Sequence, residues 1–256
     1  MLRIFLALWL ALTPALSWAG SMSLLGVGKA AGGGGGPPSL TFITASNLVD
    51  GGANKTLTAV GIGTASATRI IFAVVVGSLI GGGVLPTSLT FTPNAGSPVT
   101  ATLVINQTVS TDPWGAIYQA VVPTGTTMDV TLAWASNPFS NFQMSLWSSD
   151  TSTMSSTTAT GTAKNNLASG NAVVTATLAA SAGGFIIVGA VSEQSASNST
   201  TWSGGETYTK RFDTSINGVQ SSFADASNIT GNASDTATAT FAQSTAAVGI
   251  IAASWR

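Results

Sequence analysis

Short apolar runs alternate with polar turns along most of the chain. After residue 39, segments rich in Val, Ile, Thr, Phe and Trp are separated by Gly, Pro, Asn and Ser. Segments of this length and composition predict β-strands, and no window carries the i, i+3, i+4 spacing of an amphipathic helix. The sequence therefore predicts an all-β protein.

The predicted strands form two series, separated by a stretch rich in Ser, Thr, Gly and Asn. The first series comprises residues 40–44, 56–60, 69–77, 88–92, 99–105, 116–122, 128–135 and 142–147. The second comprises residues 172–178, 184–191, 200–203, 207–212, 219–224, 236–242 and 247–255. Once the opening segment is set aside, seven strands of the first series stand against seven of the second.

Corresponding strands of the two series have the same character, which indicates an internal duplication. Segments 69–76 and 184–191 are both nearly unbroken apolar runs, as expected of central strands covered on both faces. Segments 128–134 and 236–241 both alternate. Since any two β-sandwiches can share a strand count, the matched order and run types carry this interpretation.

The pattern also predicts which residues face inward and how the chain divides. The inward positions of the alternating strands are Met128, Val130, Leu132 and Trp134 in the first series and Ala237, Ala239 and Phe241 in the second. Each series ends on an apolar strand with a late tryptophan, Trp147 or Trp255. We predict two tandem, jelly-roll-like β-sandwich halves over 40–150 and 172–256, joined by a Ser/Thr-rich linker over 151–171.

The first 39 residues differ from the rest. Arg3, the apolar run 4–12 and the small residues after it follow the pattern of a secretory signal peptide over 1–19. The run is too short for a stable membrane span, and the alternative is a start at Met22. A run of five consecutive glycines over 32–36, followed by two prolines, predicts a flexible linker over 20–39.

Charge is scarce. The chain has 8 basic and 9 acidic residues, 7% of its length and a net charge of −1, against 68 Ser and Thr residues. So few scattered basic residues cannot neutralise a run of phosphates, which excludes nucleic-acid binding. A near-neutral surface lacks the repulsion that keeps molecules apart and suits a subunit of an assembly. We expect exposed sheet edges to be used in an assembly or covered by the other half.

The chain lacks the residues of the common catalytic centres. It has no Cys and no His, which excludes disulfides, Cys/His zinc sites and histidine acid–base catalysis. The acids that could pair as in a glycosidase all lie in the second series: Glu193, Glu206, Asp213 and Asp225. Their positions in loops and at strand ends favour solvated acids.

A calcium site and a Ser–Lys catalytic pair are two further sites that the sequence could provide. Asp112, Asp150 and Asp235 lie among Ser, Thr and Asn and could ligate Ca²⁺, but without an Asp-x-Asp-x-Asp run turn capping is favoured. A Ser–Lys pair could use Lys164 or Lys210, yet nothing marks one serine as a nucleophile. The sequence predicts no enzyme, no catalytic residue, no metal and no cofactor.

Aromatic residues are the remaining candidates for binding. Trp202 and Tyr208 flank a glycine turn, and rings beside polar groups suit stacking on sugars. The alternative, which we favour, is that Trp202 plugs the end of the sandwich. Trp114, after Asp112 and a proline, is a similar but weaker candidate.

Several segments of the chain are similar to segments of a known class of proteins. The opening Met-Ser-Leu-Leu-Gly-Val-Gly-Lys over 22–29 is followed by a glycine run and two prolines, and the body contains the apolar strand 69–76, the Thr-Trp-Ser-Gly turn over 201–204 with Tyr208, and the closing apolar strand 246–255. Together they resemble Ser/Thr/Ala-rich β-sandwich structural proteins of phages and prophages. The signal-like residues depart from that pattern, because virion proteins of tailed phages assemble in the cytoplasm.

The resemblance implies a non-enzymatic structural or surface-display protein, such as a head decoration or a tail-surface subunit. Its partners would be copies of itself or other virion proteins, and its location the virion or the extracellular space. The alternative is a secreted bacterial adhesin or carbohydrate-binding protein that recognises host-surface glycans through Trp202 and Tyr208.

Overall fold

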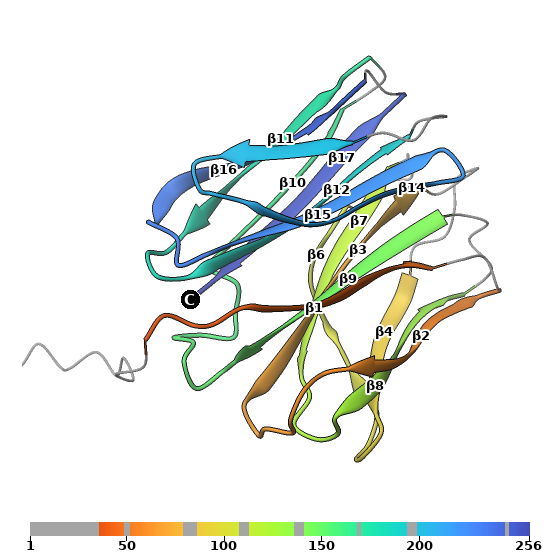
Figure 1. The fold of residues 1–256 in the computed structure, drawn as a ribbon, viewed down its shortest axis with the longest axis vertical. Coiled ribbons are helices and arrows are strands. Elements are labelled where there is room, and N and C mark those ends of the chain that lie inside the picture. Colours follow the sequence, from red (N-terminus) through yellow and green to blue (C-terminus); the bar gives the residue numbers. More distant parts are fainter. Residues whose placement is uncertain are drawn as a thin grey trace, which may run out of the picture. The chain divides into compact units, whose positions relative to one another are not determined.

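The computed structural model describes residues 36–48, 52–78, 86–107, 113–135, 141–167, 170–193, 199–243 and 246–256. These residues form strands and turns without a helix, so the all-β prediction is confirmed (Figure 1). Accordingly, no described element is a helix that could cross a membrane. The predicted signal peptide over 1–19 lies outside the described residues, as does the predicted linker up to residue 35.

The described strands fall into two consecutive sets. The first set is β1 (Thr41–Leu48), β2 (Asn54–Gly61), β3 (Arg69–Ser78), β4 (Pro86–Pro93), β5 (Val99–Thr100), β6 (Thr102–Asn106), β7 (Trp114–Val121), β8 (Thr127–Trp134) and β9 (Asn141–Asp150). The second set is β10 (Gly161–Leu167), β11 (Val173–Ala180), β12 (Phe185–Glu193), β13 (Thr200–Gly204), β14 (Thr209–Ile216), β15 (Val219–Ser227), β16 (Asn232–Phe241) and β17 (Val248–Trp255).

Each set forms a sandwich of two antiparallel sheets. In the first sandwich, inner sheet 1 has the order β1-β9-β3-β7-β6 and outer sheet 1 the order β2-β8-β4-β5. In the second, inner sheet 2 has the order β10-β17-β12-β15-β14 and outer sheet 2 the order β11-β16-β13. The first and last strands of each set are neighbours, and the two-sheet arrangement is jelly-roll-like.

The second sandwich repeats the strand order of the first. Each strand from β10 to β17 has its counterpart in the first sandwich, and β5 is the one described strand without a partner in this comparison. The sequence predicted that segment 69–76 is equivalent to 184–191, and these segments are β3 and β12. It also predicted that 128–134 is equivalent to 236–241, and these segments are β8 and β16. The duplication is therefore a property of the fold.

One strand lies where the sequence predicted a linker. Segment 151–171 contains β10, which pairs with β17 from Gly161 opposite Ser254 to Leu167 opposite Val248. The strand was missed because it lies at a sheet edge and its side chains are half-buried or exposed, without apolar alternation. With β10 as the counterpart of β1, eight strands of the first sandwich correspond to the eight strands of the second.

Three cores hold the sheets together in the order outer 1, inner 1, inner 2, outer 2. The first and second cores fill the two sandwiches, and a third, the middle core, lies between the two inner sheets. There β12 packs on β3 and β17 packs on β7 (Figure 1). Residues 34–256 consequently form one compact unit rather than two separate beads.

The central strands β3 and β12 are buried on both faces, as predicted. In β3, Ile71 and Val75 point into the first core, whereas Phe72 and Val74 point into the middle core. Gly189 of β12 faces β3, where a β-carbon would lie 2.7 Å from a methyl group of Val74. A side chain at this position would force the inner sheets apart.

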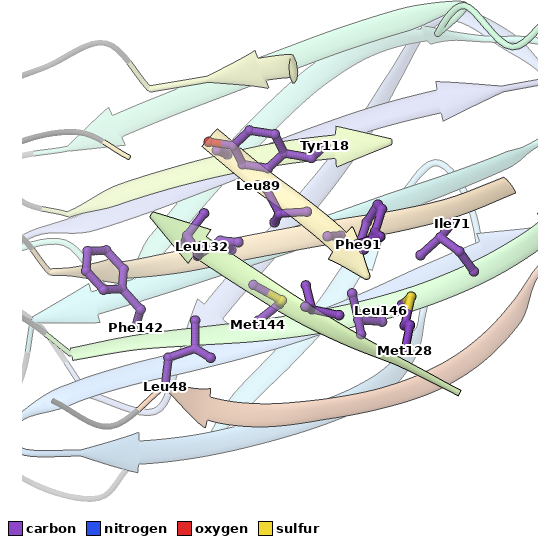
Figure 2. Packing of buried hydrophobic residues seen from close by; sticks show 14 of the residues in the cluster. Leu48, Ile71, Leu89, Phe91, Tyr118, Met128, Leu132, Phe142, Met144 and Leu146 are labelled. Carbon is purple, nitrogen blue, oxygen red and sulfur yellow. The ribbon is translucent and has the colours of Figure 1, made fainter. Parts of the chain in front are cut away.

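The predicted inward-facing residues all lie in the cores. Met128, Val130, Leu132 and Trp134 fill the first core between outer sheet 1 and inner sheet 1. Figure 2 shows Met128 and Leu132 in this core. Ala237, Ala239 and Phe241 take the corresponding places in the second core. The late tryptophans, Trp147 and Trp255, are both fully buried in the middle core.

Sheet edges are protected by irregular register and, at β13, by charged side chains that cap the strand. An extra residue interrupts the register of four edge strands, namely β1, β2, β6 and β14. At the edge strand β13, the amide of Thr200 donates to Asp213 and its carbonyl accepts from Lys210, each at 2.9 Å. Such bulges and caps hinder pairing with another chain, a route that the sequence did not reveal.

Candidate functional site

Trp202 and Tyr208, two of the three predicted binding residues, lie together at the β13 edge of outer sheet 2. Trp202 is in β13 and Tyr208 ends the turn that follows it. Their ring centroids are 6.3 Å apart with planes at 35°. Both side chains are half-buried and pack against the second core.

The polar edge of the Trp202 ring points into the protein. Its indole nitrogen donates to Ser222 Oγ at 2.9 Å, and this hydroxyl donates to the carbonyl of Phe212 at 3.2 Å. The ring therefore closes the gap between β13 and inner sheet 2. The part of the ring that remains exposed is available for stacking.

The turn over 204–208 depends on glycine and on one anchored acid. Gly204 has a φ of 152°, and a β-carbon there would collide with the carbonyl of Thr236. Glu206 Oε1 accepts hydrogen bonds from the hydroxyl and amide of Thr230, at 2.6 and 2.8 Å. The turn is thereby fastened to the connection between β15 and β16.

Asp235 lies beneath this turn. Its side chain is only 1% exposed, and neither carboxylate oxygen has a hydrogen-bond partner of normal geometry among the described residues. Burial raises its pKa, and the charge of Glu206 adds to the rise, while the nearby amides of Thr236 and Gly205 oppose it. The prediction that Asp235 caps a turn is wrong, because it faces inward from β16.

Tyr208 shares this environment. Its hydroxyl oxygen is buried and has no hydrogen-bond partner among the described residues. Burial raises the pKa of the Tyr208 hydroxyl, and the negative charges of Asp235 and Glu206 raise it further. The structure thus brings Tyr208, which contacts Trp202, near a buried carboxylate.

Asp150 and Asp112 are the other two acids that the sequence offered as calcium ligands. Asp150 follows the prediction, because its carboxylate accepts the amide of Ser152 at 2.8 Å within a turn. Hydrogen bonds from the side chains of Ser152 and Thr68, together with this amide, lower the pKa of Asp150. Asp112 lies outside the described residues.

Trp114 is not a binding residue of the surface. It begins β7 and is 1% exposed, with its ring edge-on to Phe142 at 5.8 Å in the first core. The sequence misled because a proline and an acid precede it, as at an exposed turn. A ring so enclosed cannot stack on a ligand.

The acids predicted to be solvated also have structural partners. Asp225 is 2% exposed and accepts from Trp147 Nε1 at 2.9 Å while it pairs with Arg211. Asp213 pairs with Lys210 at 2.7 Å. Since Asp225 is buried within β15, its prediction as a solvated acid at a strand end is wrong.

Neither lysine considered for a Ser–Lys pair contacts a serine in the interactions described. Lys164 Nζ donates to the carbonyl of Asn106 at 2.7 Å, and Lys210 Nζ is held by Thr200 and Asp213. The part of the chain that the structure describes contains no group of three or more acids that could hold a metal.

Two grooves occupy equivalent places in the sandwiches. A groove of about 730 Å³ lies between β1 and β2, and one of about 570 Å³ lies between β10 and β11. Their walls carry mostly threonine, alanine and asparagine, with Lys164 in the second groove. They are duplicated with the fold but contain none of the predicted aromatic residues.

Comparisons with protein-family models, with curated proteins and with solved structures found no match to this chain.

Proposed function

We propose that the protein is a non-enzymatic structural or surface-display protein of a phage or prophage particle, either a head decoration or a tail-surface subunit. The observation that carries the proposal is the middle core, which joins two duplicated sandwiches into one compact unit. A unit of this kind presents large hydroxyl-rich faces while its sheet edges resist uncontrolled pairing. The assignment to a phage rests on the resemblance of segments 69–76 and 246–255.

The use of charged residues supports a structural role. Buried Asp225 joins the two sandwiches through Trp147, and the guanidinium of Arg69 binds only backbone carbonyls in the described contacts. Glu193 of the second sandwich accepts from Ser78 of the first at 2.8 Å. Each of these groups stabilises the fold, which leaves few for chemistry.

Quantitative mass spectrometry of purified particles tests the proposal. Particles released from a host that carries the gene are expected to contain the protein at a fixed ratio to the other surface proteins. An abundant host protein serves as the control for contamination. Particles that lack the protein, or contain it in no fixed ratio, would contradict the proposal.

The second candidate function is glycan binding, which the contact between Trp202 and Tyr208 favours. A glycan array is expected to show binding that Trp202→Ala abolishes and that Trp202→Phe retains in part, because a phenyl ring still stacks. Absence of binding by the unaltered protein would count against this function.

A further inference from the structure

The second sandwich carries a carboxylate where the first carries an apolar side chain. Phe241 of β16 corresponds to Trp134 of β8, since each ends the inward series of its strand. Six residues earlier, the inward position is Met128 in the first sandwich and Asp235 in the second. Only the amides of Thr236 and Gly205 oppose the cost of burying this carboxylate among the described groups, and a buried carboxylate without an ion partner is costly, so its retention calls for a compensating group.

Besides the amides of Thr236 and Gly205, the described surroundings of Asp235 supply oxygen atoms and no cationic partner. The turn over 204–208 lies against it so closely that a β-carbon on Gly205 would collide with Asp235 Oδ1. The hydroxyl of Tyr208 is buried without a partner in the same place. The ion pairs of the second sandwich involve Lys210 and Arg211 with other acids.

Glu206 completes the set. Its Oε1 is held by Thr230, and weakly by the amide of Gly231 at 3.4 Å, so the hydrogen bonds described for this carboxylate leave its second oxygen available. The charge of Glu206 acts on both Asp235 and Tyr208, which places the three groups in one electrostatic environment. Two carboxylates and a hydroxyl are hard oxygen ligands.

We propose that Asp235, Glu206 and the hydroxyl of Tyr208 bind a hard divalent cation, Ca²⁺. Calcium takes six to eight oxygen ligands in flexible geometry, and water would supply those that the side chains do not. The bound ion would neutralise the buried carboxylate and fasten the turn over 204–208 to β16. This site goes beyond the proposed function and does not depend on it.

The site would respond to calcium outside the cell. Extracellular modules bind Ca²⁺ with dissociation constants of roughly 10⁻⁴ to 10⁻³ M, and three side-chain ligands suit that range. Since Trp202 and Tyr208 border the turn, the ion would also hold the exposed ring faces in place.

Terbium luminescence tests the site directly, because Tb³⁺ replaces Ca²⁺ and is sensitised by a nearby tyrosine or tryptophan. The full chain is titrated with Tb³⁺, and the bound ion is then displaced with Ca²⁺. Saturable luminescence that Ca²⁺ displaces is expected, and Asp235→Asn is expected to weaken binding at least about tenfold. Asp150→Asn, which alters a turn acid considered for the same ion, serves as the matched control and is expected to bind normally.

Thermal unfolding in Ca²⁺ and in a chelator provides the second readout. The unaltered protein is expected to unfold at a higher temperature with Ca²⁺, whereas Asp235→Met, which installs the residue of the first sandwich, is expected to be insensitive to Ca²⁺. The proposal is overturned if the unaltered protein shows neither saturable luminescence nor a calcium-dependent shift. It is also overturned if Asp150→Asn, rather than Asp235→Asn, removes binding.

Discussion

The two sandwiches share a topology but fill and close it differently. The first core contains large side chains such as Phe91 and Met144, whereas alanine supplies half of the buried residues of the second core. The first sandwich is closed at one end by the buried guanidinium of Arg69, where the second has Gly184 immediately before the equivalent strand β12. Strand order therefore does not require a particular core volume or a particular closing residue.

Removal of the Arg69 guanidinium, which closes only the first sandwich, is expected to have the largest effect on stability. Its guanidinium donates to six backbone carbonyls, those of Ile62, Gly63, Thr64, Val122, Thr124 and Gly125. Arg69→Met leaves these carbonyls without their partner, so we expect a loss of at least about 4 kcal/mol in the free energy of unfolding. Chemical denaturation measures the loss.

A surface lysine provides the control for this substitution. Lys164→Met removes one exposed hydrogen bond and should change the free energy of unfolding by less than about 0.5 kcal/mol. A loss at Arg69 no larger than at Lys164 would show that the closure contributes nothing to stability.

Exchanging equivalent core residues tests the difference in filling. Leu132 and Ala239 occupy the same inward position, two residues before Trp134 and Phe241. Leu132→Ala leaves a cavity and should cost about 3 kcal/mol, while Ala239→Leu overfills the second core and should cost about 2 kcal/mol. Chemical denaturation of both variants measures the free energy of unfolding. An Ala239→Leu variant as stable as the unaltered protein would mean that the second core is loosely packed.

Period-two alternation explains how much of this fold was predictable. Strands buried on one or both faces, such as β3, β8, β12 and β16, reveal themselves because each buried face demands apolar residues. The edge strand β10 was missed because its faces are half-exposed and make no such demand. The middle core was not predicted, since the sequence does not show which sheet faces which.

The candidate site was predictable in part for the same reason. Trp202 and Tyr208 are close in sequence across a glycine turn, so their contact needed no knowledge of distant strands. Trp114 was misplaced because its burial depends on strands far away in the chain. The alternation of Ala237 and Ala239, extended back by two residues, places Asp235 inward, so the sequence does contain a signal for its burial.

The two late tryptophans sharpen the comparison at the middle core. Trp147 of β9 donates to the buried carboxylate of Asp225, and Trp255 of β17 donates to the neutral amide oxygen of Gln119, each at 2.9 Å. Each sandwich thus reaches across to the other in the same manner. Trp147→Phe should cost about 2 kcal/mol and Trp255→Phe about 1 kcal/mol, because a bond to a charged group is worth more. Equal losses in denaturation experiments would indicate that ring packing, not the acceptor's charge, sets the cost.

The smallest expected effect is the pH dependence that Asp235 gives to the second sandwich in the presence of a chelator. Because burial raises its pKa above 3.8, the folded chain retains a proton that the unfolded chain releases. Its contribution to stability is then complete below pH 3.8 and is lost as the pH rises through the folded pKa. The hydroxyl of Tyr208 and the carboxylate of Glu206 face the same group, and Glu206 opposes ionisation of Asp235.

The difference in unfolding free energy between the unaltered protein and Asp235→Asn should therefore shift against the unaltered protein as the pH rises from 3.8 toward neutrality. Met128, the equivalent residue of the first sandwich, cannot titrate, so a difference that does not vary with pH would mean that Asp235 is no more protonated in the folded chain than in the unfolded one.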